Sequence, residues 1–283
     1  MEYEISLLTV MGINIVLALS LNIITGFCGQ ISLGHAAFYG TGAYCAALAT
    51  TQWGMSFWSG GLLAMVVAAI FGFFVGFASL RVRDDFLAIT TMGVGFLFLG
   101  VVRQQDALGG EMGIAGVPGS GLGEFGFMIL VLATAVLVIA FSLYIKRSWL
   151  GFAFDAIAQD QDTSRTVGID IARFKLAAFV LGTAIAGLAG SFYAHHVRFV
   201  GIDSFGFIES ISILAMVVVG GIGSIWGVVV VAAVLSVLPL WLQFVADYQL
   251  LIYGALLFSV MQFNQGGLDG IVRQLVRKWR AND

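Results

Sequence analysis

Charged residues and prolines are scarce in this sequence. Of its 283 residues, 10% are charged and 2 are prolines, whereas 60% are hydrophobic. Soluble domains carry about 25% charged residues and about 45 to 50% apolar ones. A soluble globule of this length could not bury so much apolar surface, so the composition excludes a water-soluble domain and indicates that the solvent is lipid.

Groups that carry covalent chemistry are also few, with 2 cysteines and 3 histidines. Cys28 and Cys45 lie beside apolar runs and are expected to fill small apolar spaces. His195 and His196 are adjacent, which on a helix points them about 100° apart, and no third ligand accompanies them, so no metal site is expected. No G-x-x-x-x-G-K-[ST] phosphate loop occurs, so we do not expect the chain to bind and split ATP in the usual way. We expect a protein that is not an enzyme and binds no cofactor.

Long apolar runs divide the chain into nine candidate membrane segments. Because the runs are continuous, they predict helices and not barrel strands, which alternate apolar and polar residues. The runs are 5 to 25, 33 to 51, 56 to 79, 86 to 102, 125 to 145, 174 to 194, 207 to 222, 226 to 246 and 248 to 263. Several are shorter than the 20 or so residues of a full crossing. The predicted fold is therefore an all-α integral membrane bundle over 1–263, with about 8 to 9 transmembrane helices, some broken or re-entrant.

Lysines and arginines predict the orientation. With the N-terminus outside and nine spans, eleven of the 13 basic residues fall on the inner side. These are Arg81, Arg83, Lys146, Arg147, Arg165, Arg173, Lys175, Arg273, Arg277, Lys278 and Arg280. Such an excess is typical of cytoplasmic loops. The start MEYEISLLTV lacks the basic region of a cleaved signal, so the first run is expected to be retained. The tail 264–283 is predicted to be a basic amphipathic helix on the cytoplasmic membrane surface.

Polarity gathers in one internal loop, 146–173, whose central part reads GFAFDAIAQDQDTSRTVGID. Neither Pro nor Gly interrupts 152–167, and apolar and polar positions follow the i, i+3, i+4 spacing, which predicts one amphipathic helix of about four turns. One face of this helix comprises Phe154, Ile157, Ala158, Gln161 and Arg165. Gly168 is expected to end this helix, and Asp170 to cap the next one.

This amphipathic helix has two possible roles. It could rest on lipid headgroups, or it could insert into the groove of a soluble partner and transmit motion. Asp155, Asp160, Asp162 and Asp170 would be repelled by an anionic leaflet, whereas a membrane-seeking helix normally carries Lys and Arg. The acidic content therefore favours docking.

Two glycine-rich stretches interrupt the apolar runs. The stretch GFCGQISLGHAAFYGTGAY begins at Gly26, and GGIGSIWG occupies 220–227. Non-helical backbone at membrane depth persists only beside protein or a water-filled path, so each stretch is either a broken helix near a translocation path or a tight turn packed by small residues. In the second, free N–H groups could meet a substrate carboxylate. The candidate path comprises Gln30, Ser32, Gly34, His35, Glu209, Gly220, Gly221, Gly223 and Ser224.

Glu209 belongs to this set as the one clearly ionisable side chain inside a predicted span. It either finds a partner, with Arg198 and the two adjacent histidines near in sequence, or sits at the headgroup level. A further glycine-rich stretch, 108–126, has no lysine and is expected to be an outer loop or lid, not a phosphate cradle.

These motifs together resemble a known family, the LivM-type permeases of bacterial branched-chain amino acid ABC importers. The similar stretches, in chain order, are LALSLNIITGFCGQISLGHAAFYGTGAY, RVRDDFLAITTMGVG, LGGEMGI, GFAFDAIAQDQDTSRTVGIDIARFKLAAF, AGLAGSFYA and ILAMVVVGGIGSIWG. They cover nearly the whole chain. After the last run the family often has Arg-Pro-x-Gly-Leu, whereas this chain has Asn264, Gln265, Gly266, Gly267 and Leu268.

The resemblance implies the ABC importer permease fold in the bacterial inner membrane. It implies a heterodimer with a second, LivH-like permease, two cytoplasmic ATPase subunits that hold ATP and Mg, and an extracytoplasmic binding protein; lipid is the other partner, and nucleic acid is not expected. The polar loop would then hold the coupling helix that the ATPases move. Its site residues would be Asp155, Ile157, Asp160, Asp162, Arg165 and Gly168.

The expected function is the import of branched-chain or other hydrophobic amino acids. A permease of the same family for urea or another small polar solute is an alternative. Another is an ion-coupled secondary transporter, which would normally bury titratable residues at mid-membrane depth, where only Glu209 is a candidate.

Overall fold

The structure is a computed structural model that describes residues 2–79, 84–241, 248–263 and 266–270. Nearly all of them are helical. The longer helices are α1 (Glu2–Leu21), α2 (His35–Thr51), α3 (Phe57–Ser79), α4 (Asp84–Gln104), α5 (Gly123–Arg147), α8 (Ile171–Val197), α9 (Phe207–Gly220), α10 (Ile225–Trp241) and α12 (Gln249–Phe263). The shorter elements are α6 (Trp149–Gln159), α7 (Gln161–Thr166), the π-helix η1 (Asn22–Phe27), the 3-10 turns η2 (Asp106–Leu108), η3 (Gly110–Met112) and η4 (Ile202–Phe205), and the strands β1 (Ile114–Ala115) and β2 (Phe199–Val200).

Within the described residues, 6 helices are long and apolar enough to cross a membrane. They are Glu2–Phe27, Phe57–Ser79, Phe86–Gln104, Gly123–Arg147, Ile171–Val197 and Ile202–Gly220. The helices α2, α10 and α12 have 17, 17 and 15 residues. At about 1.5 Å per residue they fall short of a hydrocarbon core about 30 Å thick. The chain is thus an all-α polytopic membrane protein, while the count of eight or nine spans stays a prediction. Of the predicted tail helix, 264–283, the described residues include only 266–270.

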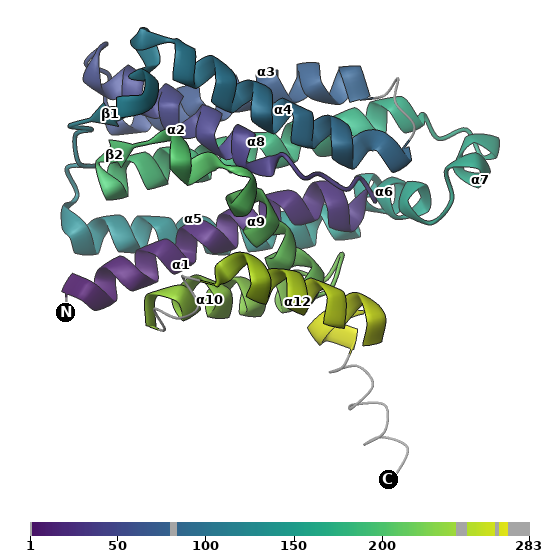
Figure 1. Cartoon of the computed structure of the whole chain (residues 1–283). Helices are drawn as coiled ribbons and strands as arrows, with labels where there is room; N and C mark the ends of the chain where they lie inside the picture. The colour runs from purple at the N-terminus through teal and green to yellow at the C-terminus, as the bar shows by residue number, and fades with distance from the viewer. Residues whose placement is uncertain (1, 80–83, 242–247, 264–265, 271–283) are drawn as a thin grey trace.

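The centre of the bundle is formed by α1, α2 and α8, with α3, α4, α5 and α10 around them (Figure 1). Burial agrees with this arrangement, since each central helix buries half or more of its residues. The outer helices expose large apolar side chains instead, such as Phe74 on α3 and Leu97 on α4. Exposed apolar faces on a bundle of this length are what lipid or a second membrane subunit covers.

Small residues bring the central helices into close contact. A Cβ atom added at Gly42 of α2 would overlap the backbone of Gly187 on α8, and one added at Gly190 of α8 would lie 2.7 Å from the Ala43 nitrogen of α2. In lipid, helix association depends on such close packing, because burial of apolar surface supplies no driving force between helices.

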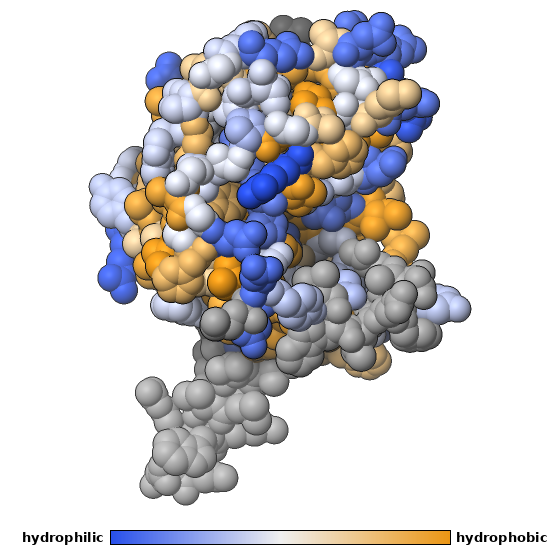
Figure 2. All heavy atoms as spheres, turned by 90° about the vertical axis from the view of Figure 1, so that its left-hand side faces the viewer, coloured by the Kyte–Doolittle hydropathy of each residue, from blue (hydrophilic) through white to orange (hydrophobic). Residues whose placement is uncertain are grey.

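The two ends of the bundle are polar. At one end, β1 and β2 pair as a short antiparallel ribbon on the same side of the bundle as the N-terminus of α1 (Figure 1, left). We call this the ribbon end. Figure 2 views this end and shows hydrophilic residues gathered over its face. At the opposite end, α6 and α7 project beyond the bundle (Figure 1, right). We call this the α6–α7 end. The membrane normal therefore runs along the long helices, from one polar end to the other.

Both glycine-rich stretches interrupt helices, as the sequence predicts. The first helix continues as η1 to Phe27, after which residues 28–34 leave helical geometry and α2 begins at His35. The second interruption follows Gly220, and α10 begins at Ile225. Gly221 and Gly223 have φ angles of 108° and 78°, which a residue with a Cβ rarely adopts.

Candidate coupling region and helix breaks

The polar loop forms two short helices, not the single four-turn helix that its periodicity predicts. The helix α6 ends at Gln159, and α7 begins at Gln161. Between them Asp160 has φ −158° and ψ 113°, which is extended backbone. Its carboxylate accepts the N–H groups of Asp162 at 2.9 Å and Thr163 at 3.1 Å, together with the Thr163 hydroxyl at 2.7 Å. Asp160 is thus an N-cap, whose side chain replaces helical hydrogen bonds for the first turn of α7.

These hydrogen bonds also fix the charge of the cap. The pKa of the Asp160 carboxyl lies below its ordinary value of 3.8, chiefly because the side chain and then the backbone of Thr163 donate to it. Hydrogen bonds to the ionised form favour that form. A lowered pKa in the folded protein means that the cap contributes fully at neutral pH and is lost only as the pH falls through that lowered value.

Two further predictions for this loop are confirmed. Gly168 follows α7 with φ 85°, and its N–H donates to the Arg165 carbonyl at 3.0 Å. Asp170 caps α8, because its carboxylate accepts the Arg173 N–H at 3.2 Å and also pairs with the Arg173 side chain at 2.9 Å. The turn at Gly168 and the cap at Asp170 therefore connect α7 to α8 through a short segment.

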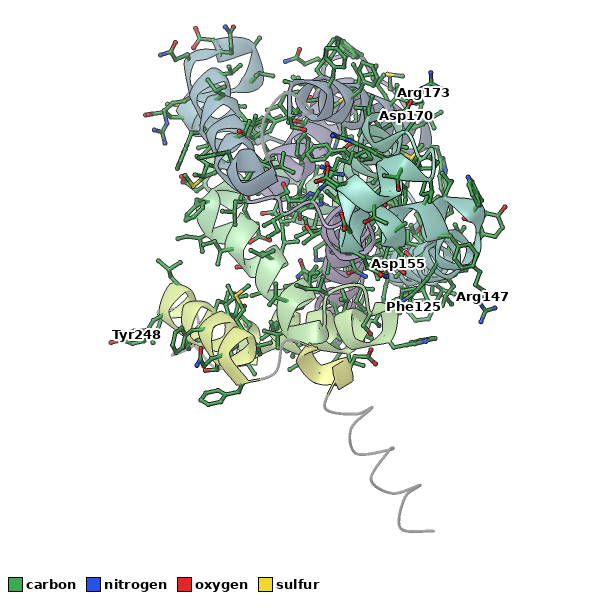
Figure 3. The ribbon with its side chains drawn as sticks, turned by 90° about the vertical axis from the view of Figure 1, so that its right-hand side faces the viewer. Phe125, Arg147, Asp155, Asp170, Arg173 and Tyr248 are labelled. Carbon is green, nitrogen blue, oxygen red and sulfur yellow. The ribbon has the colours of Figure 1, made fainter. Side chains whose placement is uncertain are left out.

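The six residues predicted for coupling do not share one face. Ile157 is buried in the core, and so is the neighbouring Phe154, whose ring meets the edge of Phe174 on α8. These two side chains fasten α6 to the bundle. Asp155, Asp162 and Arg165 are instead exposed. Figure 3 views this end and shows Arg147, Asp155, Asp170 and Arg173 at its surface.

Sequence reasoning missed three apolar side chains at this end. Trp149, Phe152 and Val167 are 73%, 64% and 72% exposed. Trp149 and Val167 also line a groove of about 560 Å³ that reaches the first turns of α8. The sequence does contain a pattern that indicates them, because Trp149 and Phe152 lie three residues apart and therefore share one face of a helix. Exposed aromatic groups beside carboxylates are suited to a protein partner, since aromatic residues are enriched at interfaces.

The cap at Asp160 can be tested directly. In Asp160→Ala the first turn of α7 loses its acceptor, so we expect α7 to unwind and solute uptake to fall about fivefold. Asp160→Asn keeps one acceptor oxygen and should retain most of the uptake. Asp106→Ala, which removes an exposed carboxylate in η2, outside α6 and α7, serves as the control. Uptake by intact cells, normalised to the amount of chain in the membrane, is the measurement; equal uptake in Asp160→Ala and Asp106→Ala would contradict the role of the cap.

The first helix break lies directly against this region. A Cβ added at Gly29 would lie 3.2 Å from both the Cα and the Cβ of Ala158 on α6. Gln30 is buried, and its Nε2 donates to the carbonyl of Lys175 on α8 at 3.0 Å. The Lys175 ammonium in turn donates to Gln161 of α7 at 2.9 Å. Residues 28–34 are therefore connected to both α6 and α7.

Beyond Gln30, the break leads into the start of α2 at His35. His35 is fully buried, and a hydrogen bond of 2.7 Å joins its Nε2 to the Ser20 hydroxyl of α1. Among the described residues, the Ser32 hydroxyl and the His35 Nδ1 are buried without a hydrogen-bond partner. Gly34 packs so closely on α4 that an added Cβ would lie 2.6 Å from the Thr91 carbonyl carbon. Buried polar atoms without partners are costly, so this break is a natural place for water or a polar solute group.

The second break is closed in this conformation. The N–H groups of Gly221, Ser224 and Gly227 donate to groups of the same segment, α9 to α10, and the N–H of Gly223 donates to Asn22 of η1 at 3.0 Å. These four donors are therefore occupied and do not form the free cradle for a carboxylate that the glycines suggest. Gly220 instead provides close packing, since an added Cβ would lie 2.6 Å from the Val228 Cα.

Glu209 lies in the first turn of α9 and is half-buried. The residues near Glu209 in sequence, namely Arg198 and the two adjacent histidines, line a separate pocket, and Glu209 is not among the residues that line it.

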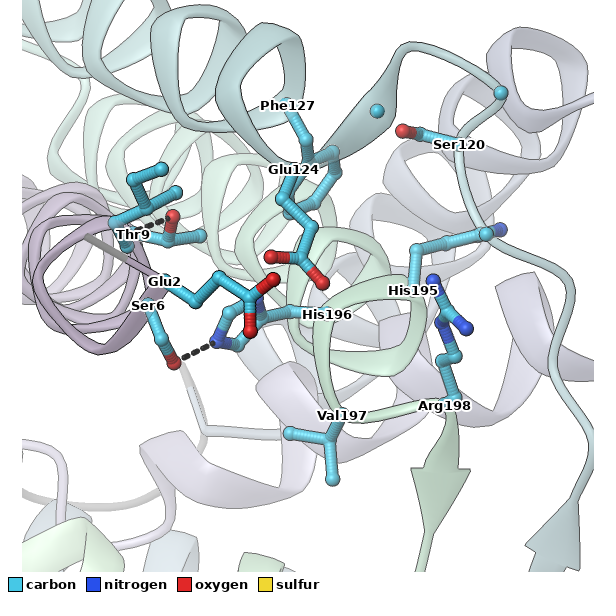
Figure 4. Close-up of a pocket in the computed structure, with 14 residues that line it drawn as sticks. Glu2, Ser6, Thr9, Ser120, Glu124, Phe127, His195, His196, Val197 and Arg198 are labelled. Carbon is cyan, nitrogen blue, oxygen red and sulfur yellow. Dashed lines mark hydrogen bonds between the residues drawn. The ribbon is translucent and has the colours of Figure 1, made fainter.

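That pocket lies at the ribbon end, between α1, α5 and the end of α8 (Figure 4), and has a volume of about 810 Å³. The imidazole of His196 hydrogen-bonds to the Ser6 hydroxyl at 3.1 Å, while His195 Nδ1 hydrogen-bonds to the Ser191 carbonyl at 2.7 Å. The adjacent histidines thus serve different neighbours. Within the part of the chain that the structure describes, no group of 3 or more His, Cys, Asp and Glu residues could hold a metal ion.

Comparisons with known proteins agree with this architecture. Residues 4–261 match the family model described as branched-chain amino acid transport system / permease component. The chain is 33% identical to the high-affinity branched-chain amino acid transport system permease protein LivM of Salmonella typhimurium LT2, over 95% of this chain and 71% of that protein. For LivM of Escherichia coli K12 the identity is 32%, over 95% and 70%.

A shorter similarity links the chain to the permease protein LivH of Salmonella typhimurium LT2, at 30% identity over 38% of this chain and 35% of LivH. No solved structure matches the chain. The family model and the LivM relatives each cover more than nine-tenths of the sequence, including both helix breaks and the polar loop. The chain belongs to the branched-chain amino acid transport system permease family, as a multi-pass membrane subunit for transport.

Proposed function

We propose that the chain is one of two related permeases in an ATP-driven importer of branched-chain or other hydrophobic amino acids. The names of its relatives supply the substrate class. The observation that carries the proposal is the connection from α6 and α7 to the first helix break, through Ala158 against Gly29 and through Gln161, Lys175 and Gln30. A force applied to α6 and α7 from outside the bundle therefore reaches a buried polar break directly.

The α6–α7 end is the docking site for ATPase subunits in this proposal. It combines exposed Trp149 and Phe152 with the carboxylates of Asp155 and Asp162, on a short helical element outside the bundle. A groove in a soluble partner recognises an amphipathic helix in this way. ATP and Mg belong to those partners, and the α6–α7 end faces the cytoplasm of a bacterial inner membrane, with the N-terminus outside, as the basic residues predict.

The translocation path in this proposal passes the first break, where the Ser32 hydroxyl and His35 Nδ1 are buried without partners. It runs along the interface with a second, LivH-like permease, toward which exposed apolar helices such as α4 are turned. An extracytoplasmic binding protein delivers the amino acid at the ribbon end. Rocking of one permease against the other then exposes the path to each side in turn.

The test is to purify the chain in mild detergent from its native membrane, identify the copurifying subunits by mass spectrometry, and reconstitute the complex in liposomes. We expect a second permease and ATPases, and uptake of labelled leucine that requires ATP and the binding protein. Uptake without ATP, driven by an ion gradient, would overturn the proposal in favour of a secondary transporter. Uptake of labelled urea but not leucine would keep the importer and overturn the substrate class.

A further inference from the structure

The turn between α9 and α10 is held by a side chain from a distant part of the sequence. The side-chain amide of Asn22 in η1 makes two hydrogen bonds to the backbone of this turn. Its Oδ1 accepts the Gly223 N–H at 3.0 Å, and its Nδ2 donates to the Ser224 carbonyl at 3.3 Å. Asn22 is 1% exposed, so both bonds are shielded from water. We call this arrangement the Asn22 clamp.

The backbone around the clamp has no spare room. A Cβ added at Gly26 of η1 would lie 2.6 Å from the Gly223 nitrogen and would also overlap the Asn22 amide. Gly221 is just as close to the segment after α12, since an added Cβ would lie 2.7 Å from the Gly266 carbonyl oxygen. The turn is thus fixed between η1 and residues 266–270.

A third contact joins the turn to the α6–α7 end. The Lys146 ammonium, in the last turn of α5, donates to the Gly223 carbonyl at 2.7 Å. Gly223 therefore receives the clamp at its N–H and Lys146 at its carbonyl. The Lys146 ammonium nitrogen also lies 5.8 Å from the centre of the Phe27 ring in η1, the element that carries Asn22.

Lys146 is also coupled to α6 through the backbone. A Cβ added at Gly151, in the first turn of α6, would lie 2.8 Å from the Lys146 Cα and would overlap the Ile145 carbonyl. The contact is between backbone atoms, with no flexible side chain between them, so a tilt of α6 displaces the Lys146 backbone. Elsewhere α6 and the turn are apart, because a cavity of about 540 Å³ has Phe152 and Asp155 of α6 on its wall together with Gly223 and Ser224.

We propose that Lys146 is a positioning residue that passes movement of α6 to the α9–α10 turn, and that the Asn22 clamp passes it on to α1. This inference rests on the proposed function, because it assumes that ATPases move α6. It adds a second route, distinct from the one through Gly29 and Gln30, which reaches the second helix break. The two breaks then move together, as alternating access about a buried path requires.

The test compares Lys146→Met with Arg147→Met in the complete complex in liposomes. Both changes remove one exposed positive charge at the end of α5, but the structure gives the contact with Gly223 to Lys146. We expect Lys146→Met to lower ATP-dependent uptake about tenfold, as loss of a charged hydrogen bond allows, while ATP hydrolysis falls less than about twofold. The number of ATP molecules hydrolysed per solute imported should therefore rise. Lys146→Arg, which keeps a donor, should restore most of the uptake.

The Asn22 clamp is tested beside it with Asn22→Leu and Asn22→Asp. We expect Asn22→Leu, which loses both hydrogen bonds, to uncouple hydrolysis from uptake as Lys146→Met does, and Asn22→Asp, which keeps the acceptor, to lie between it and the unchanged protein. An unaltered ratio of hydrolysis to uptake in Lys146→Met overturns the inference, and so does an equal effect of Arg147→Met. The unchanged complex is measured first. If its uptake does not need ATP, the proposed function fails, independently of either variant.

Discussion

Gly42→Val should strongly destabilise the bundle. An added Cβ would overlap the Cα and carbonyl oxygen of Gly187 and lie 2.6 Å from its carbonyl carbon, so the neighbour is rigid backbone of α8 and not a flexible side chain. Overpacking of an interior costs about 1 to 3 kcal/mol even where side chains can adjust, and here they cannot. We expect a loss of about 3 kcal/mol or more, seen as a fall of about 10 °C in the unfolding midpoint in detergent.

The matched control is Gly93→Val on α4, where an added Cβ meets nothing within 4 Å. Both changes place a β-branched residue inside a helix, so the intrinsic cost to the helix is the same. The comparison isolates the contact between α2 and α8. If the two variants unfold at the same temperature, close backbone packing is not what holds the centre of the bundle together.

The sequence predicts the helix breaks and the membrane bundle well because both follow from local chemistry. Apolar length indicates each helix, and glycine with its positive φ indicates where a helix stops, as at Gly221 and Gly223. The end at Gly168 and the cap at Asp170 follow in the same way from residue type. Each of these features depends on residues within about four positions of one another.

The split between α6 and α7 was missed for a physical reason. Helical periodicity describes which residues share a face, and it continues without a gap when one residue leaves the helix. An aspartate can occupy a helix surface or cap a new helix, and the choice depends on whether its carboxylate finds N–H groups, as Asp160 does with Asp162 and Thr163. The sequence likewise cannot say against what an apolar residue packs, and Ile157, predicted as part of the coupling helix, is buried in the core.

The contacts that matter most for coupling are distant in the sequence, and no local pattern contains them. Lys146 and Gly223 are 77 positions apart, and Asn22 and Gly223 are 201 apart. An exposed lysine at the end of an apolar helix is typical of a cytoplasmic boundary, which is how sequence analysis treats it. Only the fold brings its ammonium to the carbonyl of a broken helix. The role proposed for Lys146 therefore rests on a contact that the fold shows and the sequence does not.

Gly29→Val should separate the movement of α6 from the first helix break. Gly29 has φ 72°, and an added Cβ would lie 3.2 Å from the Cα and Cβ of Ala158. The two further methyl groups of valine would then force α6 away from residues 28–34. A coupling free energy of 1 to 3 kcal/mol corresponds to about 5- to 150-fold. We expect ATP-dependent uptake to fall about tenfold, with the chain still inserted and still associated with its ATPases.

Backbone strain alone must be excluded as the cause, and the chain offers a matched site. Gly54 has φ 62°, and an added Cβ there meets nothing within 4 Å, so Gly54→Val carries similar strain without a contact to α6. A β-branched residue at positive φ is unfavourable at both positions. Uptake measured in liposomes should fall in Gly29→Val and persist in Gly54→Val. Equal uptake in the two variants would mean that α6 moves without engaging the break. The connection through Lys146 to the α9–α10 turn would then be the remaining route from the ATPases into the bundle.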